Sequence, residues 1–115
     1  DIIIVVMLET PKAINNVQEI ASVPGIDVLL VGTNDLCMEM GIPGEFNHND
    51  VKESYKKVIQ ACNNNNILPG MGGVYDETLM HEYIDLGMKF ILSGSDLSFL
   101  VKGAEDRLNN LKNKG

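Results

Sequence analysis

Three carboxylates follow short apolar segments of the chain: Glu9 after IIIVVML, Asp35 after VLLVGTN and Asp96 after FILSGS. In parallel β/α architectures the active site lies where strands end and loops begin, so such side chains can converge there. Two carboxylates held close together are costly unless a cation neutralises them. Glu9 and Asp35 leave consecutive strands, and the pattern therefore predicts a shared hard divalent ion such as Mg²⁺ or Mn²⁺.

Each carboxylate also has an interpretation that needs no metal, because a carboxylate after a strand is often a helix cap or a solvated loop residue. For Asp96, in GSDLSFL, we expect the helix N-cap. For Glu9, the cap position is already filled by Thr10. The residue pattern alone leaves both interpretations of the pair Glu9 and Asp35 open.

The histidines and cysteines are the other candidate reactive groups. His48, in FNHND, lies in a long loop before a predicted helix, so we expect an exposed or capping role rather than catalysis. His81, in LMHEY, lies in the middle of a predicted helix and is expected on the outside of the fold. Cys37 and Cys62 match no metal-binding spacing, which predicts free thiols.

Four short apolar runs are the strands expected to position these groups: residues 2–8, 27–31, 67–71 and 89–93. They are apolar on both faces, as is typical of parallel strands covered by helices. Pro69 and Gly70 are unfavourable inside a strand, which makes the third run the least typical.

Helical patterns follow each of these runs. The expected caps are Thr10, then Asn49 or Asp50, then Asp76, and Gly87 is the expected stop of the third helix. The four predicted helices cover residues 11–23, about 50–61, 77–86 and about 97–110.

Strand and helix thus alternate four times within one predicted unit, residues 1–115, which indicates an α/β fold with a parallel sheet. A weak repeat supports this, because PGIDVLLVGTNDL and LGMKFILSGSDL both place Gly-x6-Gly across a strand and Asp-Leu after it. Four such units are half of a (β/α)8 barrel, or else a small doubly wound domain.

The charge balance excludes some partners. The chain has 115 residues, a net charge of −7 and nine Lys and Arg in total, so we expect no nucleic-acid or anionic-membrane partner. No apolar run approaches the roughly 20 residues that span a bilayer, and the first run lacks a basic start, which predicts a cytoplasmic protein. Because the chain opens at Asp1 directly on an apolar run, we expect a piece of a longer protein.

The segments VMLETPKAINNVQEIASVPGIDVLLVGTNDLCMEMG, LPGMGG and LGMKFILSGSDLSFLVKGA resemble, in this order, the C-terminal half of the HpcH/HpaI aldolase/citrate lyase family. The most specific feature is a Glu after one strand with G-x-x-D-L after the next, preceded by PG-x-D. The resemblance implies the C-terminal half of a TIM barrel in a class II, metal-dependent pyruvate aldolase, with the N-terminal half absent.

The resemblance also implies residue roles. Glu9 and Asp35 match the family's two metal ligands, for Mg²⁺ or Mn²⁺, with Co²⁺ and Zn²⁺ as alternatives. Gly32 and the backbone N–H groups of Asn34 and Asp35 match the family's contact with the substrate carboxylate. The implied reaction cleaves a 4-hydroxy-2-oxo acid or a 2-keto-3-deoxy sugar acid to pyruvate and an aldehyde, with the metal stabilising the enolate.

Two features depart from the family. Thr33 stands where Pro is common and Cys37 where Ser is common, which bears on substrate range more than on chemistry. The family's catalytic His and Arg belong to the N-terminal half, so no catalytic residue is assigned here. Arg107, the only Arg, lies in the last predicted helix and does not match. These residues alone would bind metal at most, whereas a full barrel would complete the active site.

Three other functions remain open. A CoA-ester lyase of the citryl-CoA or malyl-CoA type belongs to the same superfamily, but a basic CoA-binding region is missing. The glycine-rich loops GMGGVYD and SGSD could instead bind phosphate. A half-barrel could also be a non-catalytic module that self-associates through its open sheet edges. The family further implies a homo-oligomer, with DLSFLVKGAEDRLNNL as the candidate contact segment.

Overall fold

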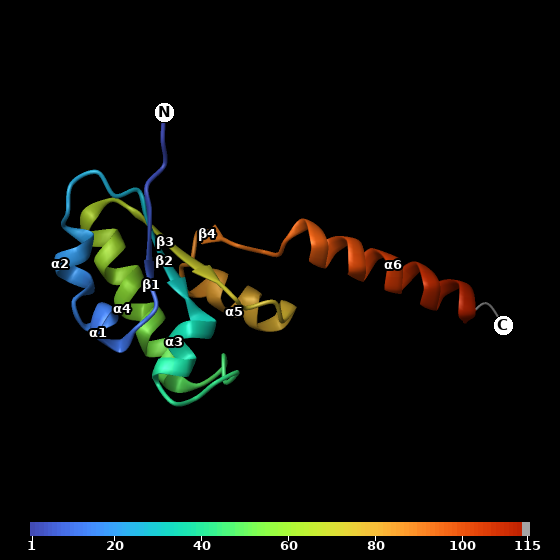
Figure 1. The fold of residues 1–115 in the computed structure, drawn as a ribbon. Helices are drawn as coiled ribbons and strands as arrows, with labels where there is room; N and C mark the ends of the chain where they lie inside the picture. Colours follow the sequence, from blue (N-terminus) through green and yellow to red (C-terminus); the bar gives the residue numbers. More distant parts are fainter. Residues whose placement is uncertain (114–115) are drawn as a thin grey trace.

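The computed structural model describes residues 1–113 and contains a four-stranded parallel sheet in the order β1-β2-β3-β4 (Figure 1). The last two residues of the predicted unit 1–115 lie outside the described residues. The strands are β1 (Val5–Leu8), β2 (Val28–Gly32), β3 (Leu68–Gly72) and β4 (Phe90–Ile91). The helices are α1 (Pro11–Asn15), α2 (Val17–Ala21), α3 (Thr33–Glu39), α4 (Asn49–Asn65), α5 (Glu77–Leu86) and α6 (Asp96–Lys112).

All four predicted strands form, and all pair in parallel as expected. β3 forms despite Pro69 and Gly70. The carbonyl of Pro69 accepts a hydrogen bond from the N–H of Lys89, and a side chain at position 70 would meet the carbonyl of Phe90 at 2.8 Å. β1 is shorter than predicted because its ladder with β2 begins at Val5, opposite Val28.

The first predicted helix is interrupted. Thr10 caps it as expected, its side chain accepting from the N–H of Ala13 at 3.1 Å. The helix then breaks at Asn16 into α1 and α2, and Val17 and Ala21 in α2 are buried. Asn has a weak helix propensity, because its side chain competes with the backbone for hydrogen bonds.

Two predicted helix starts are wrong by one or two residues. The N-cap of α4 is His48, whose Nδ1 accepts from the N–H of Asp50 at 3.1 Å, and not Asn49 or Asp50. The N-cap of α6 is Ser95, and Asp96 is the first residue of the helix instead of its cap. The caps of α5 are as predicted, with Asp76 at its start and Gly87 at its end.

The helix α4 also runs further than predicted, through three of the four consecutive asparagines after Cys62. Asn65 donates from its side chain to the carbonyl of Ala61 at 2.9 Å, which satisfies an acceptor in the last turn. Asn66 then ends the helix in the left-handed conformation, with φ of 56°. Asn is one of the few residues that adopts this conformation readily.

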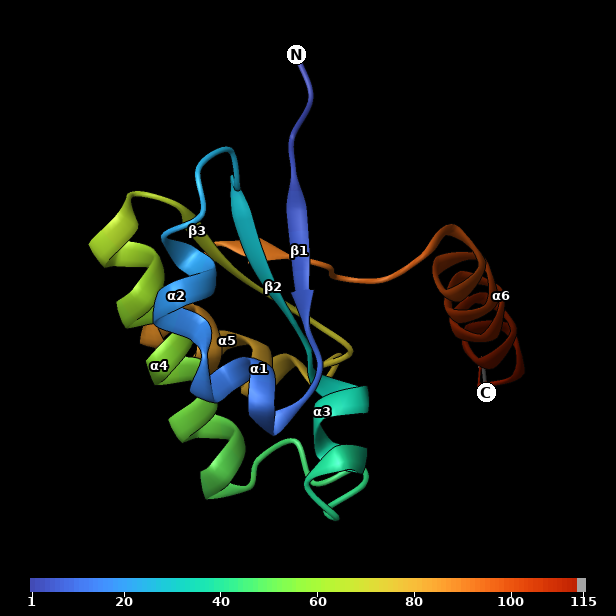
Figure 2. The same cartoon turned by 60° about the vertical axis from the view of Figure 1, so that its left-hand side comes forward.

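The two faces of the sheet have different environments. On one face, Leu8, Leu29, Val31 and Met71 belong to the hydrophobic core formed with α1, α2, α4 and α5, and Figure 2 shows these helices on one side of the sheet. The opposite face carries Met7, Leu30, Gly70 and Phe90 side by side in register. The side chain of Met7 is 53% exposed. This arrangement is that of a partial barrel whose inner face is not closed.

The helix α6 stands away from this body, as Figures 1 and 2 both show. It has no buried residue along its length. Within residues 1–113, every helix is too short or too polar to span a lipid bilayer.

Candidate metal and substrate site

Glu9 is placed by the register of the first two strands. Leu8 of β1 is paired with Val31 of β2. The residues that follow them, Glu9 and Gly32, therefore lie beside one another at the carboxyl ends of these two strands. A Cβ atom at position 32 would approach Glu9 Cγ to 2.8 Å and Oε1 to 3.0 Å. The carboxylate of Glu9 therefore leans across the end of β2, and only glycine leaves room for it.

Asp35 is placed by a short helix that begins where β2 ends. It lies in the first turn of α3, with its side chain exposed to solvent. The first turn of a helix carries unpaired backbone N–H groups and the positive end of the helix dipole. The four helices predicted from the sequence do not include α3, so this short helix is an additional element that carries Asn34 and Asp35.

The loop after β3 packs against the start of α3. Gly73 has a φ of +85°, and a Cβ atom there would lie 3.3 Å from the backbone nitrogen of Asn34. Gly72 is paired with Gly32 in the sheet. The glycine-rich loop GMGG thus lies beside the start of α3, and it keeps that side of the Asn34 backbone free of side-chain atoms.

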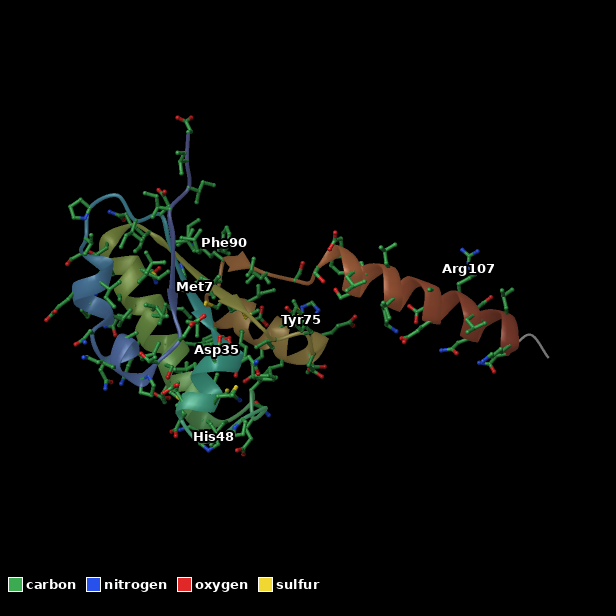
Figure 3. All side chains as sticks on the ribbon, in the orientation of Figure 1. Met7, Asp35, His48, Tyr75, Phe90 and Arg107 are labelled. Atoms are coloured by element: carbon green, nitrogen blue, oxygen red, sulfur yellow. The ribbon has the colours of Figure 1, made fainter. Side chains whose placement is uncertain are left out.

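The candidate donors at this edge are the two carboxylates. Within residues 1–113, no group of three or more His, Cys, Asp or Glu side chains is arranged to hold a metal ion, and neither Glu9 nor Asp35 forms an ion pair. Mg²⁺ typically takes only one or two carboxylates and completes its octahedron with water and substrate oxygens. Two carboxylates at one strand edge fit such an ion. Arg107 lies on α6, away from Asp35 (Figure 3).

A buried hydroxyl pair supports this segment, and the sequence interpretation did not identify it. Thr33 and Tyr55 are both fully buried, and Thr33 Oγ1 lies 2.5 Å from the hydroxyl of Tyr55. Burial raises the pKa of the Tyr55 hydroxyl, so it stays protonated. The signal in the sequence was a tyrosine on the apolar face of a predicted helix, because a buried tyrosine hydroxyl needs a partner.

The remaining candidates behave as predicted. His48 is a helix cap, and His81 is exposed on α5. Cys37 and Cys62 are buried free thiols. Burial raises the pKa of Cys37, with a smaller contribution from Glu45, and burial raises the pKa of Cys62 to about 11. Both thiols are therefore protonated and poor nucleophiles in the folded protein.

Comparisons with known proteins find a matching family model and similar sequences. The family model described as HpcH/HpaI aldolase/citrate lyase matches residues 1–103. A 4-hydroxy-4-methyl-2-oxoglutarate aldolase from Chaetomium globosum is 36% identical over 105 residues, which cover 90% of this chain and 39% of that protein. A 4-hydroxy-2-oxo-heptane-1,7-dioate aldolase from Klebsiella pneumoniae is 32% identical, with 89% of this chain and 38% of that protein covered.

The fold has a close counterpart among solved structures. The crystal structure of an HpcH/HpaI aldolase from Desulfitobacterium hafniense superimposes with a TM-score of 0.85 at 26% identity, covering 99% of this chain and 44% of that chain. This chain therefore spans about two fifths of the length of the curated relatives described above. The architecture is that of a partial TIM barrel.

Proposed function

Because this chain belongs to the HpcH/HpaI aldolase/citrate lyase family, we propose that it supplies the metal and substrate site of a class II aldolase. The reaction is cleavage of a 4-hydroxy-2-oxo acid, or of a 2-keto-3-deoxy sugar acid, to pyruvate and an aldehyde. The observation that carries the proposal is the packing of the Glu9 side chain against Gly32, the residue that precedes the helix bearing Asp35. The names of the two curated relatives, both 4-hydroxy-2-oxo acid aldolases, support the substrate class.

The proposed ion is Mg²⁺ or Mn²⁺, with Co²⁺ and Zn²⁺ as alternatives, and Glu9 and Asp35 would hold it. When bound, such an ion supplies Lewis-acid stabilisation of negative charge on the oxygens of a 2-oxo acid. The backbone N–H groups of Asn34 and Asp35 would donate to the substrate carboxylate, because they belong to an unpaired first helical turn. Gly32 and Gly73 present no side chain that would block the approach.

The remaining parts of the active site would come from the rest of a full barrel. The described residues at this edge offer carboxylates and amides but no histidine, since His48 caps α4 and His81 lies on α5. A full barrel would cover the open face around Met7 and bring an acid–base group to the substrate. We therefore assign binding to this chain, and proton transfer to the remainder of the protein.

Two alternatives are less well supported. The family description also covers citrate lyases, which include CoA-ester lyases, but both curated relatives described above are aldolases. A separate phosphate site in the glycine-rich loop after β3 is disfavoured because Gly73 packs against the backbone of Asn34, within the proposed pyruvate site.

The test is a calorimetric titration of oxalate, a pyruvate enolate analogue, into the protein that contains this chain, with Mn²⁺ or with EDTA. We expect oxalate binding only with the metal, and at least a tenfold loss of Mn²⁺ affinity in Glu9→Gln and in Asp35→Asn, since each removes a charged ligand. Asp96→Asn is the matched control, because Asp96 is an exposed carboxylate at the start of α6. Unchanged Mn²⁺ affinity in both ligand variants would refute the metal assignment.

A further inference from the structure

We propose that Tyr55 is a positioning residue: through its hydrogen bond to Thr33, it holds the Gly32–Asp35 segment in the geometry that binds metal and substrate. This inference rests on the proposed function for its consequence, but its structural part can be measured without metal. Tyr55 comes from α4, which is remote in the sequence from the segment it would control. Among residues 1–113, its hydroxyl bonds to Thr33 and not to either proposed metal ligand.

Either hydroxyl of the pair could donate, and one arrangement of the hydrogen bonds uses both protons. The Thr33 hydroxyl has one proton, and its geometry allows it to donate to the carbonyl of Val31, at 3.4 Å. The oxygen of Thr33 then accepts from the hydroxyl of Tyr55, at 2.5 Å. The two bonds thus connect Tyr55 on α4, through Thr33 at the start of α3, to the backbone carbonyl of Val31 near the end of β2.

A second tyrosine, Tyr83, packs against the ring of Tyr55. The rings of Tyr55 and Tyr83 pack with their centroids 4.4 Å apart and their planes tilted by 49°. The hydroxyl of Tyr83 donates to the carbonyl of Phe46, in the loop that precedes α4. The Tyr83 ring therefore limits the movement of the Tyr55 ring, while its own hydroxyl bonds to a different part of the chain from Thr33.

The segment needs such support because α3 is too short to be stable alone. It has seven residues, and isolated helices of that length are unstable in water. Three of its residues are buried, namely Thr33, Leu36 and Cys37. Leu36 and Cys37 offer only non-directional packing, whereas the Thr33 hydroxyl fixes a direction. Thr33 is two residues from Asp35, so a change at the hydroxyl is transmitted over a short path.

A purely structural role is the competing explanation, in which Thr33 only satisfies a tyrosine hydroxyl in the core. Tyr83 provides the comparison needed to separate the two roles. Tyr55→Phe and Tyr83→Phe each remove one buried phenolic hydroxyl from the same stacked pair, so both should lower the thermal stability. Only Tyr55→Phe removes a bond to the α3 segment.

The experiment measures two properties of the protein that contains this chain. The first is hydrogen exchange, by mass spectrometry, of a peptide spanning α3 in metal-free protein. The second is Mn²⁺ affinity. For Tyr55→Phe we expect faster exchange in α3 and roughly a 10-fold loss of Mn²⁺ affinity, the usual effect of losing a residue that orients a ligand. For Tyr83→Phe we expect both to stay within about twofold of the starting protein.

Variants at Thr33 test the hydroxyl itself. Thr33→Val should reproduce the effects of Tyr55→Phe, and the double variant should lose no more than either single variant, because the two residues act through one bond. Thr33→Ser keeps the hydroxyl and should retain slow exchange and Mn²⁺ affinity. Equal behaviour of Thr33→Ser and Thr33→Val, or of Tyr55→Phe and Tyr83→Phe, would overturn the proposal. If the starting protein binds no Mn²⁺, the proposed function fails, and the exchange measurement alone decides this inference.

Discussion

Gly32 is closely packed in the candidate site. Its backbone lies against the side chain of Glu9, so the absent side chain at position 32 is what lets the carboxylate lean across β2. We predict that Gly32→Ala weakens Mn²⁺ binding about tenfold, because a Cβ atom 2.8 Å from Glu9 Cγ must displace a proposed ligand. The Mn²⁺ affinity of the variant is measured by isothermal titration calorimetry.

The control for this variant is Gly103→Ala. A Cβ atom at position 103, in α6, would meet no atom within 4 Å, so the same chemical change has no steric consequence there. Equal Mn²⁺ affinities for the two variants would mean that the position of Glu9 does not depend on Gly32.

The individual residues show how far the sequence could predict the site. Glu9 and Asp35 could be proposed because the carboxyl ends of neighbouring parallel strands meet at one edge, and their roles as ligands stay predictions. The contact between Thr33 and Tyr55 could not be proposed, since no local pattern indicates which residue on α4 faces the end of β2. Packing between distant elements decides that pair.

The helix α4 is the longest element of the body, and its first turn depends on an unusual cap. His48 accepts a hydrogen bond from the N–H of Asp50 through Nδ1. The N-cap position of a helix more often holds Asn, Asp or Ser. We predict that His48→Ala lowers the free energy of unfolding by about 1 kcal/mol, the usual cost of losing a cap, and that His48→Asn retains it. Urea unfolding followed by circular dichroism measures both.

His81→Ala is the matched control, because His81 is exposed within α5 and does not cap it. A stability loss in His81→Ala as large as that in His48→Ala would mean that the cap is not the cause.

At the scale of elements, the sequence predicted the four strands and four helical regions but not the short helix α3. Apolar runs predicted all four strands, including β3, because burial on both faces outweighs the poor strand propensities of Pro69 and Gly70. The break at Asn16 was not predicted, since the apolar repeat of Ile14, Val17 and Ala21 continues across it. Caps were predicted within two residues, which is the usual precision of helix boundaries.

The whole molecule is a partial barrel with one face left open. Its strand order β1-β2-β3-β4 follows the chain order, as in consecutive strands of a barrel, which excludes a doubly wound order here. Alternation of strands and helices predicted this α/β architecture. The assignment to the C-terminal half of the barrel stays a prediction. The single unit 1–115 and the cytoplasmic location also stay predictions.

An exposed apolar surface runs along α6. Leu97, Leu100, Val101, Leu108 and Leu111 recur at intervals of three, four and seven residues and so share one face, and each is at least 49% exposed. Helices with such a face normally bury it. The sequence indicated an amphipathic helix but not what it packs on. In the structure α6 stands clear of its own sheet (Figures 1 and 2).

We therefore predict that the protein forms a homo-oligomer in which α6 packs on a neighbouring subunit. Replacing Leu100 and Leu108 together by Glu should lower the mass measured by light scattering, because charged side chains cannot be buried in that contact without a large cost. Asn110→Glu is the control, since position 110 lies on the opposite face of the helix. The variant should still fold, as α6 has no residue buried against its own body. An unchanged mass in the double variant would contradict the prediction that α6 forms the contact between subunits.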